Sequence, residues 1–147
     1  MLRGVLFLLA AVFTATWSYS AASLTAMEKQ VLLDTHNAAR RAVSPTASNM
    51  RVMQWDNGIA AFAQEYAERC SFDHSSDSER SSSTGFGGAW VGENLYLTTA
   101  RLSGASIGGA VTSWVNEKEY YNFATGACSQ EPCGHYTQVG LRPCERS

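Results

Sequence analysis

Apolar side chains recur at helical spacing in three stretches of the chain, residues 23–42, 57–70 and 107–123. Each stretch places its apolar residues on one face, which predicts three amphipathic helices. Thr25 and Glu28 match the T-x-x-E capping box at the start of the first helix. The face positions are Val31, Leu32, Thr35, Ala38 and Ala39; Ile59, Phe62, Ala63, Tyr66, Ala67 and Cys70; and Ile107, Ala110, Val111, Trp114 and Val115.

Shorter stretches between these helices have a different pattern. Residues 50–55 and 134–139 are strand candidates, the first ended by Asp56 as the N-cap of the second helix. Residues 73–88 are polar and rich in serine, which predicts a surface loop, and residues 89–97 form a short apolar stretch. With no internal repeat and no linker, the pattern predicts one α+β domain in which helices pack on a small sheet.

The N-terminus has the pattern of a secretory signal peptide. Arg3 precedes an apolar run from Val5 to Phe13, and Ser20 and Ala22 are the small residues of a cleavage site. The run is too short to span a bilayer, and no second apolar run approaches the length of a membrane span. We expect residues 1–22 to be cleaved after Ala22; a buried N-terminal helix and an uncleaved anchor are the alternatives.

The net charge and the cysteine spacing limit the partners and the cross-links that the chain is expected to have. Removal of Arg3 with the signal peptide would leave thirteen acidic side chains against ten basic ones, which argues against a nucleic-acid or anionic-membrane partner. Disulfides are expected in an exported protein. Cys128 and Cys133 can close a short loop, which would leave Cys70 paired with Cys144 or unpaired. The spacing is poor for a cysteine-bound structural zinc.

Two acids and two histidines suggest a shared site. Glu93 lies among apolar residues, where a charge is costly without a partner, and Glu117 flanks the apolar face of its helix. His74 follows the second helix, and His135 follows Cys133 closely. These four side chains could satisfy one another, or they could bind a divalent cation through imidazole nitrogen and carboxylate oxygen.

A G-x-S-x-G sequence at Gly104, Ser106 and Gly108 is the pattern of a hydrolase nucleophile, with Glu117 and His135 in a suitable order after it. That motif needs a strand before the serine and a large parallel sheet, which this chain is too short to supply. We expect these glycines to precede or open the third helix instead, and we assign no catalytic residue.

Several stretches, in this order, resemble the CAP superfamily, which contains cysteine-rich secretory proteins, antigen 5 and pathogenesis-related 1 proteins. The matching stretches are HNAAR (36–40), MQWDNGIAAFAQEYAERC (53–70), His74, GENL (92–95), SWVNEKEYYNF (113–123) and CGHYTQV (133–139). The loop at 44–50 is most similar to the peptidase inhibitor 16-like and glioma pathogenesis-related-like branch. The resemblance covers residues 24–139.

The resemblance implies an α-β-α sandwich with a central cleft. The two histidines and two glutamates of the family's cleft correspond to His74, Glu93, Glu117 and His135, and some members bind zinc or another divalent cation there. It implies a secreted, non-catalytic module that binds an extracellular protein, a lipid or sterol, or a metal. A metal-dependent hydrolase acting through metal-bound water is the alternative, although no nucleophile occupies a matching position.

After Val139 the chain departs from the family pattern. The resemblance implies two further strands, and the sequence continues instead as GLRPCERS. We therefore expect an incomplete CAP domain at residues 23–139 and a divergent tail at 140–147, from a splice isoform, a frameshift or a fragment. A two-stranded sheet would be marginal and its edges open, so an isoform without independent activity is a third reading. In the family, the cysteine that corresponds to Cys70 pairs with a cysteine in the region that the sequence here lacks. Cys128 and Cys133 resemble a local pair of the family, and Cys144 matches no family position.

Overall fold

The computed structural model describes residues 23–83, 91–99 and 103–141. The predicted signal peptide (1–22), part of the predicted serine-rich loop and most of the predicted tail lie outside these residues. None of the described helices is long and apolar enough to cross a membrane.

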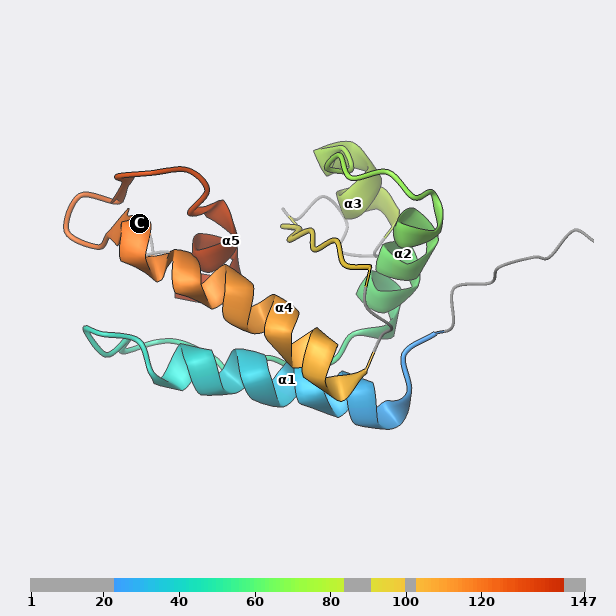
Figure 1. Cartoon of the computed structure of the whole chain (residues 1–147), viewed down its shortest axis with the longest axis horizontal. Coiled ribbons are helices and arrows are strands. Elements are labelled where there is room, and N and C mark those ends of the chain that lie inside the picture. Colours follow the sequence, from blue (N-terminus) through green and yellow to red (C-terminus); the bar gives the residue numbers. More distant parts are fainter. Residues whose placement is uncertain (1–22, 84–90, 100–102, 142–147) are drawn as a thin grey trace, which may run out of the picture.

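Helices α1 (Ala26–Arg41) and α4 (Gly104–Asn116) form the larger helical pair and pack against each other (Figure 1). Val31 of α1 lies beside Gly104 and Gly108, where an added Cβ atom would be in ordinary van der Waals contact. A methyl group at either position would therefore fit against α1 without separating the two helices. The buried side of α4 consists of Ile107, Ala110 and Val111, of which Val111 is fully buried.

Both helices begin with the capping interactions that their sequences specify. Thr25 and Glu28 form the reciprocal capping box of α1, as predicted. Ser103 and Ser106 form an equivalent box ahead of α4, so Gly104 opens that helix and Ser106 lies in its first turn. This arrangement confirms the helical interpretation of the G-x-S-x-G sequence.

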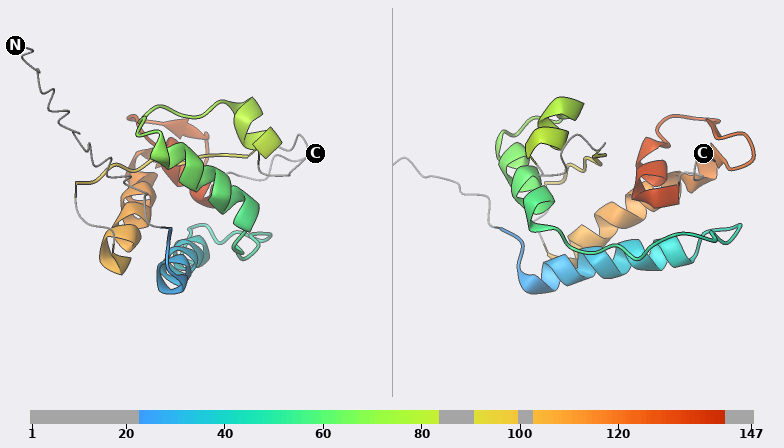
Figure 2. Two further views of the ribbon diagram at one scale, coloured as in Figure 1. Left: turned by 90° about the vertical axis from the view of Figure 1, so that its right-hand side faces the viewer. Right: turned by 180° about the vertical axis from the view of Figure 1, so that it is seen from behind.

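Helix α2 (Asn57–Glu68) and the short helix α3 (Asp77–Ser83) form a second group, which stands apart from the α1–α4 pair in the view from behind (Figure 2). Asp56 caps α2 as predicted. Phe62 and Tyr66 are the buried residues of α2. Residues 91–99, which form neither helix nor strand, lie between α3 and α4 in the sequence.

After α4 the chain makes one 3-10 turn, η1 (Glu117–Tyr120), and then the antiparallel strands β1 (Tyr121–Asn122) and β2 (Ala127–Cys128). Helix α5 (Gly134–Tyr136) and the irregular helical turn η2 (Thr137–Leu141) follow. The predominance of helices with a small two-stranded sheet agrees with the predicted α+β class.

Four local predictions were wrong, the last of which, at residues 50–55, is described in the next paragraph. Residues 134–139, predicted as a strand, form α5 and the start of η2 because the side chain of Glu117 accepts hydrogen bonds from two successive backbone amides there. The third helix ends seven residues early, at Asn116, where η1 begins. The predicted loop at 73–88 contains α3, begun by a hydrogen-bonded Ser76–Glu79 capping box.

Residues 50–55, predicted as a strand, form no strand in the structure, because a side chain rather than a neighbouring strand pairs with their backbone. The amide of Asn37 accepts a hydrogen bond from Met53 N at 2.8 Å and donates one to Met53 O at 3.2 Å. Arg40 donates to Arg51 O at 2.6 Å and to Val139 O at 2.8 Å. Through these hydrogen bonds, Asn37 and Arg40 of the HNAAR stretch hold residues 50–55 and the adjacent part of η2 against α1.

Candidate functional site

His74 and Glu93 form the first of two histidine–carboxylate pairs. His74 Nδ1 lies 2.7 Å from Glu93 Oε2, and because a carboxylate only accepts, Nδ1 carries the proton. Ser75 donates to the same carboxylate from its backbone N at 3.0 Å and its hydroxyl at 2.6 Å. The loop before this pair is held by Tyr66, whose hydroxyl donates to Asp73 O at 2.8 Å. The histidine is thus fixed on its Nδ1 side and remains exposed on the other.

Arg80 of α3 lies behind this pair and is buried. Its guanidinium donates to Val91 O at 2.7 Å and to Ser75 O, and lies 3.7 Å from Glu93 Oε2. Burial alone would raise the pKa of Glu93, but the hydrogen bonds from Ser75 and His74 and the charge of Arg80 outweigh burial and lower it. Glu93 is therefore an ionised acceptor.

His135 and Glu117 form the second pair. His135 Nδ1 lies 2.6 Å from Glu117 Oε1, while the other carboxylate oxygen accepts from His135 N at 3.1 Å and Tyr136 N at 3.3 Å. Both oxygens of Glu117 are thus occupied as acceptors, so Nδ1 of His135 carries the proton. One carboxylate fixes the backbone and the ring of the same histidine.

Trp114 packs behind the second pair. Its ring lies 6.2 Å from that of His135, 6.1 Å from His36 and 6.4 Å from Tyr96, measured between centroids. Its indole N–H donates to Leu95 O at 3.0 Å. Trp114 therefore links α1, α4, α5 and the segment that carries Glu93.

His36 has a different environment from the other two histidines. Its Nδ1 donates to Leu32 O at 2.8 Å. Burial lowers the pKa of His36, the carbonyl of Leu32 partly opposes this, and Arg40 lowers it further. His36 is a neutral packing residue of α1 and does not line the pocket described next.

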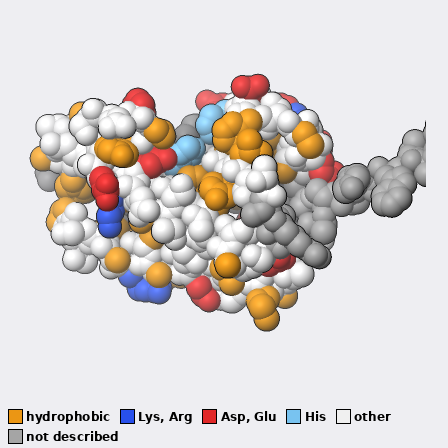
Figure 3. Space-filling view, in the orientation of Figure 1, with side chains coloured by type: hydrophobic (Ala, Val, Ile, Leu, Met, Phe, Trp, Pro, Cys, Tyr) orange, Lys and Arg blue, Asp and Glu red, His pale blue; other side chains and the backbone are white. Residues whose placement is uncertain are grey.

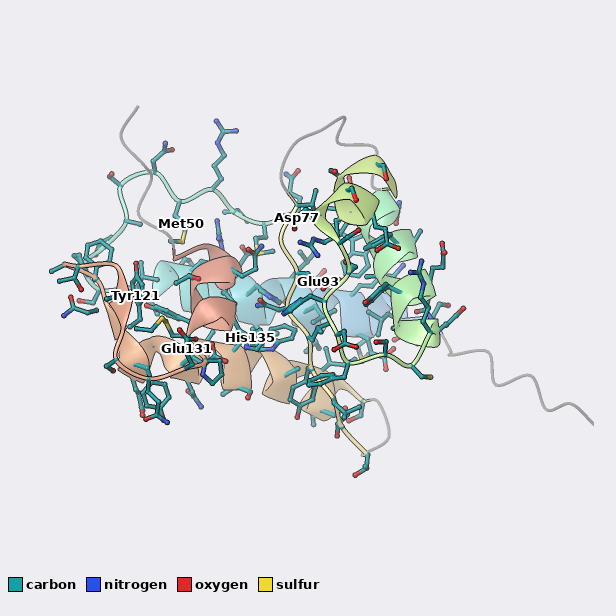
Figure 4. The ribbon with its side chains drawn as sticks, turned by 90° about the horizontal axis from the view of Figure 1, so that it is seen from above. Met50, Asp77, Glu93, Tyr121, Glu131 and His135 are labelled. Atoms are coloured by element: carbon teal, nitrogen blue, oxygen red, sulfur yellow. A yellow bond between two sulfur atoms is a disulfide. The ribbon has the colours of Figure 1, made fainter. Side chains whose placement is uncertain are left out.

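His74, Glu93 and His135 line one pocket of about 350 Å³, together with Asn94 and Glu131. Histidine side chains lie in the hollow between the two raised parts of the molecule in Figure 3. In Figure 4 His135 lies between Glu131 and Glu93. Asn94 helps to hold the wall, since its amide donates to His135 O at 3.0 Å. The four residues predicted from the sequence are thus brought together as two pairs, with Glu117 bound behind His135.

Among the described residues, no group of three or more His, Cys, Asp or Glu side chains is placed to hold a metal ion. The arrangement therefore differs from a cage of four direct ligands. It offers two imidazoles whose Nδ1 atoms are already bound to carboxylates and whose Nε2 atoms are not.

A disulfide joins Cys128 of β2 to Cys133, with 6.0 Å between their Cα atoms, which confirms the predicted local pair. It closes the loop that carries Glu131 to the pocket and fixes the backbone just before α5. Cys70 is exposed just after α2, has a positive φ of 54°, and has no disulfide partner among the described cysteines. Cys144 lies outside the described residues.

Sequence reasoning missed two residues that support the site, Arg80 and Ser75. Both are buried in the stretch that was predicted as a surface loop. The Ser76–Glu79 pair matches the S-x-x-E capping box, and that signal could have placed Arg80 on a helix. No local signal indicates that its guanidinium reaches Glu93.

The model of the cysteine-rich secretory protein family, CAP, matches residues 33–143. Peptidase inhibitor 16 of Mus musculus is 42% identical over 125 residues, which are 84% of this chain and 23% of that protein. GLIPR1-like protein 1 of Bos taurus is 42% identical over 104 residues, 71% of this chain and 42% of that protein. Allurin of Xenopus tropicalis is 44% identical over 108 residues, 74% of this chain and 51% of that protein.

This chain spans only about a quarter to a half of the length of these relatives. The predicted similarity to peptidase inhibitor 16 and the glioma pathogenesis-related proteins is confirmed. Because the family model covers most of the sequence, including all four residues of the two pairs, the chain belongs to the cysteine-rich secretory protein (CAP) family.

Proposed function

We propose that this protein is a secreted, extracellular binding module without catalytic activity, whose histidine pocket holds a divalent cation and contacts an extracellular protein or lipid partner. Membership of the cysteine-rich secretory protein family supports secretion, as does the signal-peptide pattern at residues 1–22.

The same membership supports the α-β-α sandwich expected from the sequence, with β1 and β2 in its sheet. A crystal structure with no sheet between helical layers would contradict that arrangement.

One observation carries the proposed cation site. His74 and His135 line the same pocket, and each donates its Nδ1 proton to a carboxylate. Histidines that bind metal in proteins commonly donate their other ring N–H to a carboxylate, which fixes the tautomer and the ring orientation. Neutral imidazole is an ordinary zinc ligand, so the two rings would supply two of the three or four protein ligands that zinc sites in proteins use.

In this arrangement His74 and His135 would supply the ligating nitrogens, and Glu93 and Glu117 would orient them. Two ligands from this chain fall short of the three or four that zinc sites use, so the partner would supply a further donor group. The cation would supply a positive anchor for such a group. Glu93 and Glu117 hold the two imidazole rings, and Arg80 and Ser75 keep Glu93 in place.

Thermal unfolding of the full chain with increasing zinc tests this proposal. A ligand that binds only the native state stabilises it by RT ln(1 + [L]/Kd), about 2.7 kcal/mol at a hundredfold excess over Kd. We expect zinc to raise the unfolding temperature of the wild type and of His36→Gln, whose ring lies outside the pocket. His74→Ala and His135→Ala should each lose most of that rise. The absence of a rise in the wild type, or an equal rise in all variants, would contradict the proposal.

A further inference from the structure

A second pocket lies at the C-terminal end of α1 and is unrelated to the histidine pocket. It has a volume of about 200 Å³ and shares no lining residue with the first. Met50, labelled in Figure 4, marks its place apart from His135. Arg40, Arg41 and Arg51 line it, and no acidic side chain does.

These three arginines differ from the other described arginines in their partners. Arg69 and Arg80 each form salt bridges with two carboxylates. Arg40, Arg41 and Arg51 form no salt bridge with any side chain in the described ranges. The chain as a whole has a formal net charge of −2, so three arginines that lack a salt bridge among the described residues form a local positive region in a weakly acidic protein.

Arg40 is only half-exposed, which makes its lack of a counter-ion more costly. Its two terminal nitrogens donate to the neutral carbonyls of Val139 and Arg51, and its buried Nε has no hydrogen-bond partner in the described structure. Burial lowers the pKa of Arg40. The C-terminus of α1 favours cations, but that effect is weak at an exposed helix end and does not involve Arg51, which lies outside the helix.

We propose that this pocket binds a sulfate or phosphate monoester, with the oxyanion held between Arg41 and Arg51 and the charge of Arg40 behind them. Guanidinium groups match the oxygen geometry of such anions and bind them in a bidentate manner. The remaining walls include Ala47, Met50 and Val52, which suit the carbon skeleton of the ester. The exposed side chains of Arg41 and Arg51 are accessible to the ligand, whereas Arg40 is already anchored.

The test is an NMR titration of the full chain with three matched probes: glucose 6-sulfate, glucose 6-phosphate and neutral glucose. We expect one or both esters to shift backbone amides around Met50, and glucose to leave them unchanged. A preference for one ester identifies the anion. The affinity should fall with added salt, because exposed charges are screened.

Arg41→Gln combined with Arg51→Gln should weaken ester binding at least tenfold, since hydrogen bonds to charged groups are worth about 1.5–3 kcal/mol and 1.4 kcal/mol is a factor of ten. Both side chains are exposed, and the Arg51 carbonyl that Arg40 uses remains in the variant. Arg69→Gln, which removes a positive charge outside the pocket, should bind as the wild type does. Ester binding that is absent, matched by glucose, or unchanged in the double variant would overturn the proposal.

Discussion

Glu117 contacts His135 at two places, its ring and its backbone amide. It also accepts a hydrogen bond from the backbone amide of Tyr136. Glu117, the C-cap of α4, therefore holds the first turn of α5. The carboxylate side chain is only 12% exposed, which protects these hydrogen bonds from water. Glu117 therefore supports the pocket from behind by holding the backbone and the ring of His135.

Replacement of Glu117 by alanine should lower the free energy of unfolding by about 2–3 kcal/mol. The change leaves two backbone amides and a ring N–H without their acceptor, and lost hydrogen bonds to charged groups cost about this much. Urea denaturation measures the loss. Glu119→Ala, an exposed neighbour in η1, should change stability by less than about 0.5 kcal/mol. Equal effects of the two changes would contradict the role of Glu117.

His36 should make stability depend on pH. Burial lowers its pKa below the ordinary value of 6.5, so the unfolded chain binds a proton more readily than the folded one. The stability that this adds is present above pH 6.5 and is lost as pH falls from there through the lowered pKa. The slope contributed by one group is at most about 1.4 kcal/mol per pH unit.

Urea denaturation of the wild type at pH 7.5 and at pH 5.5 should therefore show a loss of stability that is smaller in His36→Gln. Glutamine can still donate to Leu32 O but does not titrate. An identical loss in the variant would show that other groups cause it.

Residue chemistry suggested the four site residues and the family resemblance specified them, but their pairing could not be predicted from the sequence. The partners are 19 residues apart in His74–Glu93 and 18 in Glu117–His135, and no local pattern predicts such contacts. Residue chemistry alone indicated that Glu93 needed a partner. It could not indicate that Arg80 and Ser75 would join His74 in supplying one, because those contacts depend on how α3 packs.

At the level of elements, the junction between α1 and η2 depends on one glycine. Gly140 has a φ of 107°, a backbone conformation that residues with a Cβ atom rarely adopt. An added Cβ there would also meet the guanidinium of Arg40, which holds Val139 O. The close approach of α1 and η2 therefore needs glycine at this position.

Gly140→Ala should destabilise the protein by about 2 kcal/mol, within the range for a non-glycine residue held in a strained backbone conformation. Gly109→Ala is a matched control, since Gly109 lies inside α4 with open space around it. That change should stabilise by about 0.5–1 kcal/mol, the difference between alanine and glycine in a helix. Differential scanning calorimetry of both variants checks the two signs. A stabilising Gly140→Ala would contradict the described junction.

Long helices were predictable from the sequence and short elements were not. The faces of α1, α2 and α4 span several turns, and capping residues mark their starts. Residues 134–139 contain Tyr, Thr and Val, which favour strands, but Glu117 and Arg40 hold their backbone in helical turns. Contacts from distant residues decided that segment, and local propensity could not reveal them.

On the scale of the whole molecule, the histidine pocket draws on both helical groups. The lining residues His74 and Arg80 come with α2 and α3, whereas His135 comes with α5 and is held by Glu117 at the end of α4. The segment 91–99 connects them, since Glu93 pairs with His74 and Asn94 bonds to His135 O. Anything bound by both histidines would therefore hold the two groups together.

Export is a prediction for the whole chain. Protein collected from the medium of secreting cells should begin near Ser23, because the signal peptide is expected to be cleaved after Ala22. N-terminal sequencing gives the answer directly. Recovery of protein that begins at Met1 would contradict cleavage.

Nitrogen NMR of the imidazole rings during a zinc titration tests the proposed site most directly, because it reports each ring nitrogen separately. Without zinc, Nδ1 of His74 and of His135 should carry the proton that each donates to its carboxylate. As zinc is added, Nε2 of both rings should shift together while both Nδ1 atoms stay protonated, and His36 should not respond. A response from His36, from Nδ1, or from only one of the two pocket histidines would contradict the proposed two-histidine site.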